Sequence, residues 1–260
     1  MTDLVKYSRD GRLVRITLNR PDKLNALSDD VLIELRQAFY DFDDDQEAWV
    51  AILSGEGRAF CSGADVGQRQ LRPIDELKRL GGPQGRGAEV GHLMSRFVNT
   101  KPVIAAVHGY AVGAGFLLAL QCDLCVASED ATFQIREAER GLDPSEEWLY
   151  MRERGAGTLA TELALTNRFC SAEEAYRFGL VNRVVPTGEH LRGAEKLAEE
   201  VLNVAPLAAR ALVRTRRWPI EELDVRARQY ETAHLELTED FRESASAFVD
   251  RRPRKPFTAR

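Results

Sequence analysis

Two glycine-rich turns carry the groups in this sequence that could do chemistry without a reactive side chain. The first turn follows residues 103–107, a continuous apolar run that predicts a fully buried strand. Gly109, Gly113 and Gly115 interrupt the run, and a short apolar helix is expected over residues 116–120. The N-terminus of that helix would fall within the turn, where unpaired N–H groups and the helix dipole could hold an anion. The alternative is a turn that only lets a buried helix pack closely against a sheet.

Known phosphate-binding patterns do not explain this turn. The spacing of the three glycines lacks the third glycine of a dinucleotide-binding loop, and no Gly-Lys-Ser/Thr ending follows. A second glycine-rich turn, residues 55–65, comes after another predicted buried strand at residues 49–53. Because two strands lead into glycine turns in the same way, two backbone N–H donors could converge on one ligand.

Cysteine spacing and charge argue against several other classes of protein. The four cysteines are Cys61, Cys122, Cys125 and Cys170, and the one Cys-x-x-Cys pair has no second pair and no histidine at zinc-ligand spacing. We therefore expect reduced thiols and no metal site. The 36 basic and 41 acidic residues give a net charge of −5, which offers no electrostatic case for a nucleic-acid partner.

Targeting signals are not evident in the sequence. The first twenty residues carry charges throughout and have no apolar segment of signal-peptide length. The longest apolar run, residues 111–120, is too short to cross a bilayer. The sequence therefore predicts a cytoplasmic protein with no membrane partner.

Hydrophobic spacing and turn residues predict the elements that must position the two turns. A hairpin is expected over residues 5–18, and a helix is expected from Ser28 to Phe42. Further strands are expected at residues 124–127, 131–133 and 181–185, and loops are expected at residues 19–25 and within residues 67–100. A capping box at residues 171–174 predicts the start of a helix. Apolar residues recur at helical spacing over residues 90–97, and three or four amphipathic helices are expected over residues 190–249. These elements predict an α/β core followed by a helical C-terminal region.

Several blocks, taken together and in order, resemble the crotonase, or enoyl-CoA hydratase/isomerase, superfamily. The blocks are NRP at 19–21 with LNAL at 24–27, RAFCSGAD at 58–65, KPVIAAVHGYA at 101–111, CDL at 122–124, ATF at 131–133, AEEA at 172–175 with GLVN at 179–182, and KPF at 255–257. Each block alone is weakly specific, whereas their order and spacing over nearly the whole chain are specific for the family and not for one reaction.

The resemblance implies a fold and an assembly. The family fold is a spiral of β-β-α units followed by helices that assemble trimers, often paired into hexamers. For this chain it implies a spiral core with a CoA and acyl site over residues 1–190. A helical oligomerisation region would follow over residues 191–260, so the chain itself is an expected partner.

The resemblance also assigns an activity and its residues. The family stabilises a thioester enolate with two backbone N–H groups, which here would be those of Ala64 and Ala114. Glu137 matches a family glutamate that acts as general base, although by composition alone it would be a solvated charge. The other glutamate of typical hydratases is replaced by Leu117. Contacts with the acyl-CoA substrate are expected from Lys23, Leu24, Ala26, Ala64, Asp65, Val66 and Leu117, and from Lys255 and Phe257 of a neighbouring subunit.

Loss of one carboxylate decides which reactions are favoured. A single base can move one proton between two carbons of the same ligand, so double-bond isomerisation or a specialised enolate reaction is favoured over conventional hydration. A hydratase that uses another carboxylate, an acyl-CoA hydrolase and a non-catalytic thioester-binding scaffold remain alternatives. Asp143, Glu146 and Glu147 could supply a second carboxylate or form an exposed acidic turn before a helix. No cofactor is expected apart from the coenzyme A of the substrate.

Overall fold

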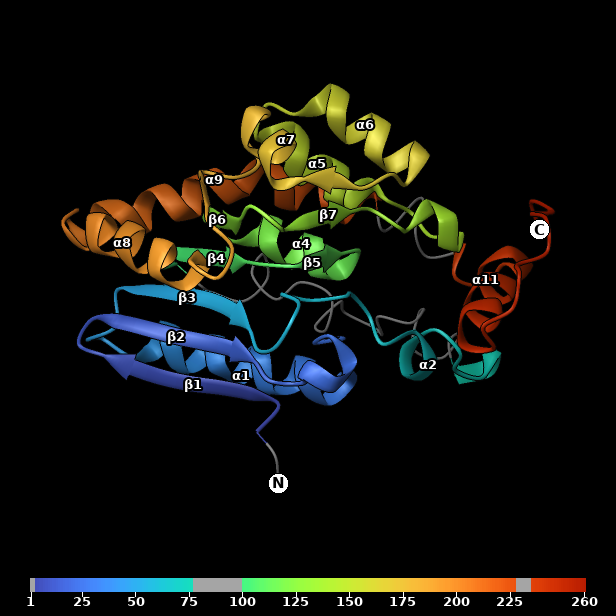
Figure 1. Ribbon diagram of the computed structural model, residues 1–260, viewed down its shortest axis with the longest axis horizontal. Coiled ribbons are helices and arrows are strands. Elements are labelled where there is room, and N and C mark those ends of the chain that lie inside the picture. Colours follow the sequence, from blue (N-terminus) through green and yellow to red (C-terminus); the bar gives the residue numbers. More distant parts are fainter. Residues whose placement is uncertain (1–2, 77–99, 228–234) are drawn as a thin grey trace.

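A computed structural model of the chain describes residues 3–76, 100–227 and 235–260, and its main feature is a six-stranded sheet (Figure 1). The strand order is β1-β2-β3-β4-β6-β9. The first two strands pair antiparallel and the others pair parallel. The strands are β1 (Val5–Asp10), β2 (Leu13–Leu18), β3 (Val50–Gly55), β4 (Val103–Val107), β6 (Leu124–Ser128) and β9 (Arg183–Val185). The expected hairpin at the N-terminus is confirmed.

A second, smaller sheet gives the chain its repeating β-β-α path. It contains β5 (Tyr110–Val112), β7 (Thr132–Gln134) and β8 (Cys170–Ser171). After β4 the chain enters this sheet as β5 and then forms α4 (Ala114–Gln121). After β6 it enters the same sheet as β7, followed by the 3-10 helix η2 (Ala138–Arg140) and α5 (Ser145–Glu153). In both units, β4-β5-α4 and β6-β7-η2, a helix begins soon after a strand of the small sheet.

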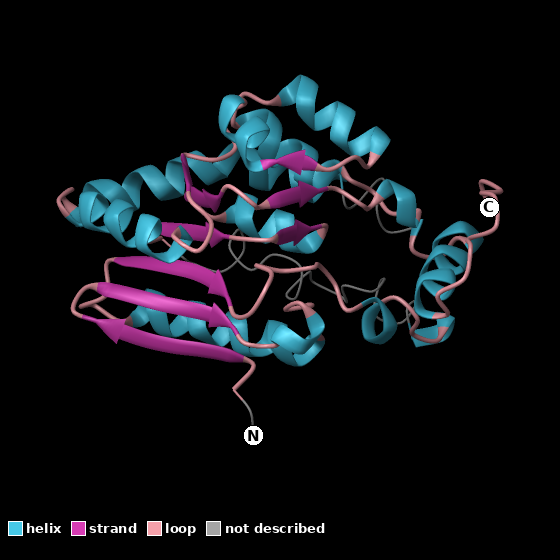
Figure 2. Ribbon diagram, viewed as in Figure 1, coloured by secondary structure: helices cyan, strands magenta, loops and turns pink. Residues whose placement is uncertain are grey.

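The central strands are apolar throughout because both of their faces are buried. On β3, Ala51 and Leu53 join the larger core, whereas Val50 and Ile52 face the other way into a smaller core. The helix α1 (Asp29–Asp44) contributes Phe39 and Phe42 to the larger core, and α8 (His190–Leu202) contributes Leu197 to the smaller one. Figure 2 shows helices alongside the strands of the large sheet. Burial on two faces explains why these strands lack the alternation of a half-exposed strand.

One helix begins at the capping box expected at residues 171–174, and another begins after Ser28, where the sequence predicts a helix. Ser28 caps α1 by accepting a hydrogen bond from the Val31 N–H, and Ser171 caps α7 (Ala172–Arg177) by accepting one from the Glu174 N–H. These interactions satisfy N–H groups that have no partner inside the helix. The helical period expected at residues 90–97 lies outside the described residues.

The remaining helices cover the small sheet and one end of the molecule. They are α2 (Val66–Arg69), α6 (Gly157–Thr166), α9 (Pro206–Ala227) and α11 (Glu239–Val249). The helix α9 packs against α5, whereas α11 packs against α2 and η2 (Figure 1). The expected boundary after residue 190 falls at the start of α8, which packs on β3, β4 and β6. Within the described residues, no helix combines the length and apolar character needed to cross a membrane.

A buried lysine joins the end of α1 to the start of β4. Lys101 is 1% exposed, and its Nζ donates to the carbonyl oxygens of Phe42 and Asp45, both at 2.6 Å. Carbonyls in the last turn of a helix have no partner inside the helix, so a cation placed there satisfies them and interacts favourably with the helix dipole.

We predict that Lys101→Met lowers the free energy of unfolding by about 2 kcal/mol, because charge-assisted hydrogen bonds are lost while the apolar stem is kept. Chemical denaturation followed by circular dichroism would measure the change. The matched control is Lys196→Met on the exposed side of α8. Equal stability of the two variants would contradict this role for Lys101.

Candidate active site

The two glycine turns lie against each other and bring two backbone amides together. Cys61 pairs with Ala111 through bonds from the Cys61 N–H to the Tyr110 oxygen and from the Val112 N–H to the Cys61 oxygen, each 3.0 Å. A Cβ built on Gly63 would lie 3.6 Å from the Ala114 nitrogen. The turn that ends at Ala64 is therefore beside the turn that ends at Ala114.

Both amides point away from the hydrogen bonds that fix their turns. Leu27 donates to the Gly63 oxygen at 2.8 Å and accepts from the Asp65 N–H at 3.0 Å, which leaves the intervening Ala64 N–H directed away from Leu27. Ala114 is the first residue of α4, and the N–H groups of a first turn have no partner within the helix. The geometry therefore suits an oxyanion held by two amides at a helix N-terminus.

Glu137 approaches this turn across a position that has no side chain. Its Oε1 would lie 2.8 Å from a Cβ built on Gly113, and its Oε2 accepts a 2.8 Å hydrogen bond from the Arg136 N–H. Gly113 also has φ of +52°. A glycine at 113 therefore serves two purposes, since it adopts a left-handed conformation and leaves room for the carboxylate beside Ala114.

A second carboxyl group lies in contact with Glu137. Glu147, on α5, is 2% exposed, whereas Glu137 is partly exposed. The two carboxyl groups are close enough to influence each other electrostatically. Burial raises the pKa of both groups, and the negative charge of Glu137 helps to hold the pKa of Glu147 well above its usual range. Both carboxyl groups are therefore harder to ionise than carboxyl groups in water.

This burial corrects one of the interpretations of the acidic segment. Glu147 does not belong to an exposed acidic turn, since it shares a helical face with the buried Tyr150 and Met151. Its neighbour Glu146 accepts a 3.3 Å hydrogen bond from the Gln121 side chain. The spacing of residues 147, 150 and 151 could have indicated this burial from the sequence, because residues three and four apart lie on the same face of a helix.

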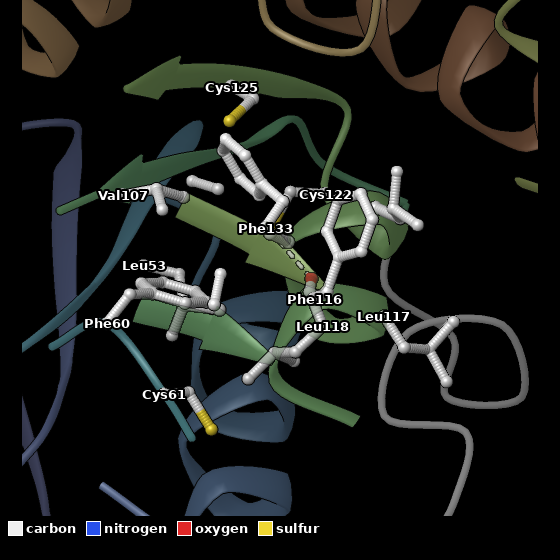
Figure 3. Packing of buried hydrophobic residues seen from close by; sticks show 14 of the residues in the cluster. Leu53, Phe60, Cys61, Val107, Phe116, Leu117, Leu118, Cys122, Cys125 and Phe133 are labelled. Atoms are coloured by element: carbon white, nitrogen blue, oxygen red, sulfur yellow. Dashed lines mark hydrogen bonds between the residues drawn. The ribbon is translucent and has the colours of Figure 1, made fainter. Parts of the chain in front are cut away.

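Leu117 brings no acid or base to the site. It lies one turn into α4, where its N–H donates to the Gly113 oxygen at 2.9 Å, and it is 8% exposed. Figure 3 shows Leu118 and Phe116 among the buried side chains, with Leu117 pointing away from that group. The carboxyl groups of Glu137 and Glu147 lie instead at the start of η2 and on α5.

The expected substrate-binding loop lies next to the first amide turn. The Ser62 N–H donates to the Leu24 oxygen at 2.9 Å, and Asp65 accepts a 2.8 Å hydrogen bond from Arg20 while capping α2. The structure thereby brings Lys23, Leu24 and Ala26 close to Ala64, Asp65 and Val66.

Lys255 and Phe257 lie on the tail that follows α11. The Lys255 N–H donates to Glu243 at 2.9 Å, and the Arg254 guanidinium lies 3.5 Å from the Phe257 ring centre. Both side chains are exposed. Because α11 packs on α2 of the same chain, the tail lies on the side of its own Val66, and a contribution to a neighbouring subunit stays a prediction.

Comparison with known proteins decides the family. The sequence model of the enoyl-CoA hydratase/isomerase family matches residues 8–259. This chain belongs to that family. It is 39% identical over 227 residues to a carnitinyl-CoA dehydratase of Salmonella typhi, a match that covers 85% of each protein.

Solved structures agree with this assignment. A carnitinyl-CoA hydratase of Mycobacterium avium is similar with a TM-score of 0.84 at 30% identity over 100% of both chains. A carnitinyl-CoA dehydratase of Mycobacterium avium 104 is similar with a TM-score of 0.83 at 31% identity, again over 100% of both chains. The expected crotonase-like α/β fold is confirmed, and the chain is an enzyme of the enoyl-CoA hydratase/isomerase family.

Substitutions at Ala114 test the amide geometry. Proline is tolerated at the first position of a helix, so Ala114→Pro removes the N–H and keeps α4. We predict that turnover of an enoyl-CoA falls about 10²-fold or more, whereas Ala114→Gly stays close to the parent enzyme. Steady-state kinetics on both variants, with folding checked by circular dichroism, would measure this. Equal activity of the two folded variants would remove the oxyanion assignment, and the same comparison applies at Ala64.

Proposed function

We propose that this enzyme transfers a proton at the α-carbon of an acyl-CoA thioester through an enolate, with Glu137 as general base. The observation that carries the proposal is the position of the Glu137 carboxylate over Gly113, one residue before the Ala114 amide. A thioester oxygen held by the amides of Ala64 and Ala114 would have its α-carbon within reach of that carboxylate. One such amide typically contributes about 3 kcal/mol of transition-state stabilisation in a water-poor site.

Double-bond migration is the reaction that this arrangement supports best. Glu137 would remove a proton from C2 of a 3-enoyl-CoA, and the electron pair of that C–H bond would delocalise onto the thioester oxygen. The same carboxyl group would return the proton to C4, which places the double bond between C2 and C3. A single carboxylate suffices for this sequence, and Leu117 supplies no second group on α4.

Reversible dehydration of a 3-hydroxyacyl-CoA is a second candidate. It is favoured by the carboxyl of Glu147 against Glu137, because elimination needs a proton for the departing hydroxyl as well as a base for the α-proton. The similarity to a protein called carnitinyl-CoA dehydratase supports the same reaction class. Hydrolysis of the thioester, or binding without turnover, would be recognised in the same assays.

We propose that coenzyme A is bound as part of the substrate and that no other cofactor takes part. Its contacts would come from Lys23, Leu24 and Ala26, from Asp65 and Val66, and from Lys255 and Phe257. The ammonium group of Lys255 suits the CoA phosphates, and Leu117 would contact the acyl group.

Turnover by Glu137→Gln tests the proposed function. The substitution keeps the size of the side chain and should preserve thioester binding, but it should lower turnover of 2-enoyl-, 3-enoyl- and 3-hydroxyacyl-CoA by about 10²-fold or more. The product ratio of the parent enzyme separates migration from hydration. Leu117→Glu should raise water addition relative to migration. Unchanged turnover by Glu137→Gln would defeat the assignment of the base.

We also propose that the chain assembles as a homotrimer or a dimer of trimers. Several large apolar side chains of the C-terminal half are exposed, including Leu165 and Leu207 at 74%, Leu212 at 69% and Trp218 at 63%. They lie on α6 and α9, and contact with other copies of the chain would remove them from water. Light scattering should give the mass of three or six chains, and the mass of one chain at micromolar concentration would contradict the proposal.

A further inference from the structure

We propose that Asn25 is the positioning residue of the first oxyanion amide: its side chain ties the loop at residues 20–27 to the turn that carries the Ala64 N–H. The proposal rests on the proposed function, because it concerns an amide that would hold the thioester oxygen. It also gives a role to a residue that the sequence analysis placed only within the block LNAL.

The hydrogen-bonding groups of Asn25 all have partners, although the residue is 0% exposed. Its Nδ2 donates to the Glu56 oxygen at 2.9 Å and to the Ala59 oxygen at 2.8 Å. Its Oδ1 accepts from the Arg20 N–H at 2.9 Å, and its own N–H donates to the Arg20 oxygen at 2.9 Å. The Cys61 thiol donates to its backbone oxygen at 3.2 Å. A buried polar side chain that is fully paired holds its neighbours at a fixed separation.

An amide side chain suits this arrangement, and a carboxylate does not. Two carbonyl oxygens face Nδ2 and one N–H faces Oδ1, so the site needs two donor hydrogens and one acceptor on one planar group. The backbone of Asn25 has φ of +56°, which asparagine adopts more readily than most residues. Gly55 leaves room for the amide, since a Cβ there would lie 2.7 Å from Nδ2.

The loop that carries Asn25 meets the oxyanion turn on both sides of Ala64. The Leu27 N–H donates to the Gly63 oxygen at 2.8 Å, and the Asp65 N–H donates to the Leu27 oxygen at 3.0 Å. Asn25, two residues before Leu27, attaches the same loop to the beginning of the turn. The turn is therefore held by this loop near both of its ends, which fixes the direction of the Ala64 N–H.

The second amide is held by different hydrogen bonds. The backbone of Cys61 pairs with Ala111, and this pairing holds the segment that leads to Ala114. Loss of the Asn25 side chain would therefore loosen the Ala64 amide while the Ala114 amide stays in place. An oxyanion is stabilised only by donors that already point at it, so a displaced first amide would stabilise the enolate less.

The experiment compares Asn25→Gly, Asn25→Asp and a control, Asn182→Gly. Glycine at position 25 removes the side chain and still accepts the left-handed backbone. The control removes a side-chain oxygen that accepts the Cys125 N–H at 2.7 Å, outside both amide turns. The kcat and KM of an enoyl-CoA are measured across pH, with melting temperatures as a check on folding. Infrared spectra of bound butanoyl-CoA, isotope-labelled at its carbonyl carbon, report the polarisation of the thioester carbonyl without turnover.

We expect Asn25→Gly to lower kcat by about tenfold or more, because a small displacement of a catalytic group is costly to the rate. The frequency shift of the bound carbonyl should become smaller in the same variant. Asn182→Gly should keep the kcat and the carbonyl shift of the parent enzyme, even where its melting temperature falls by as much.

Asn25→Asp adds a test by pH. At neutral pH its carboxylate would repel the Glu56 and Ala59 carbonyls, so kcat should fall. As the pH is lowered, kcat relative to the parent enzyme should recover, because a protonated carboxyl donates to one of the two carbonyls. Burial raises the pKa of a carboxyl group, which brings this recovery into an accessible pH range.

Two results would overturn the inference alone. The first is a folded Asn25→Gly enzyme with the kcat or the carbonyl shift of the parent. The second is an Asn25→Asp enzyme whose kcat relative to the parent does not change with pH, and this comparison decides if Asn25→Gly does not fold. An unshifted carbonyl in the parent enzyme would instead defeat the oxyanion assignment of the proposed function, and this inference with it.

Discussion

The site depends on a backbone contact between two segments that are about fifty residues apart in the chain. Cys61 pairs with Ala111, and a Cβ on Gly115 would collide with the Cys61 carbonyl. This close approach is possible because the second segment lacks a side chain at that position. Once the two segments are joined, the start of α4, the end of the 55–65 turn and the amides of Ala64 and Ala114 are all fixed relative to one another. The relative position of the two amides is thus set by main-chain hydrogen bonds and not by flexible side chains.

The carboxyl groups are added to this frame from another part of the fold. The unit that follows β7 delivers Glu137 through η2 and Glu147 through α5. The helix α4 presents Leu117 instead of an acid. The carboxyl group near Glu137 therefore comes from α5 and not from α4. This arrangement leaves the α4 side of the site apolar and gathers the acidic groups on the opposite side.

Local patterns predicted much of the fold. The apolar run of β4, the hairpin of β1 and β2, and the cap Ser171 follow from short-range spacing, which the structure keeps. The convergence of the glycine turns was inferred from their similarity to each other. The proximity of Glu147 to Glu137 could not be predicted from local spacing, because a turn lies between the two residues. Composition alone predicted a solvated side chain at Glu137, and only the family resemblance predicted that it belongs to the site.

The lack of a side chain at Gly113 limits which substitutions this position can accept. A single methyl group there would occupy the place of the Glu137 carboxylate, at 2.8 Å, and the backbone would have to hold an L-residue at φ of +52°. Position 117, three residues into α4, carries no such double constraint, since a leucine there already replaces the family's glutamate. Two positions four residues apart therefore differ in the variation they admit: other side chains fit at 117, whereas any side chain at 113 would meet the Glu137 carboxylate.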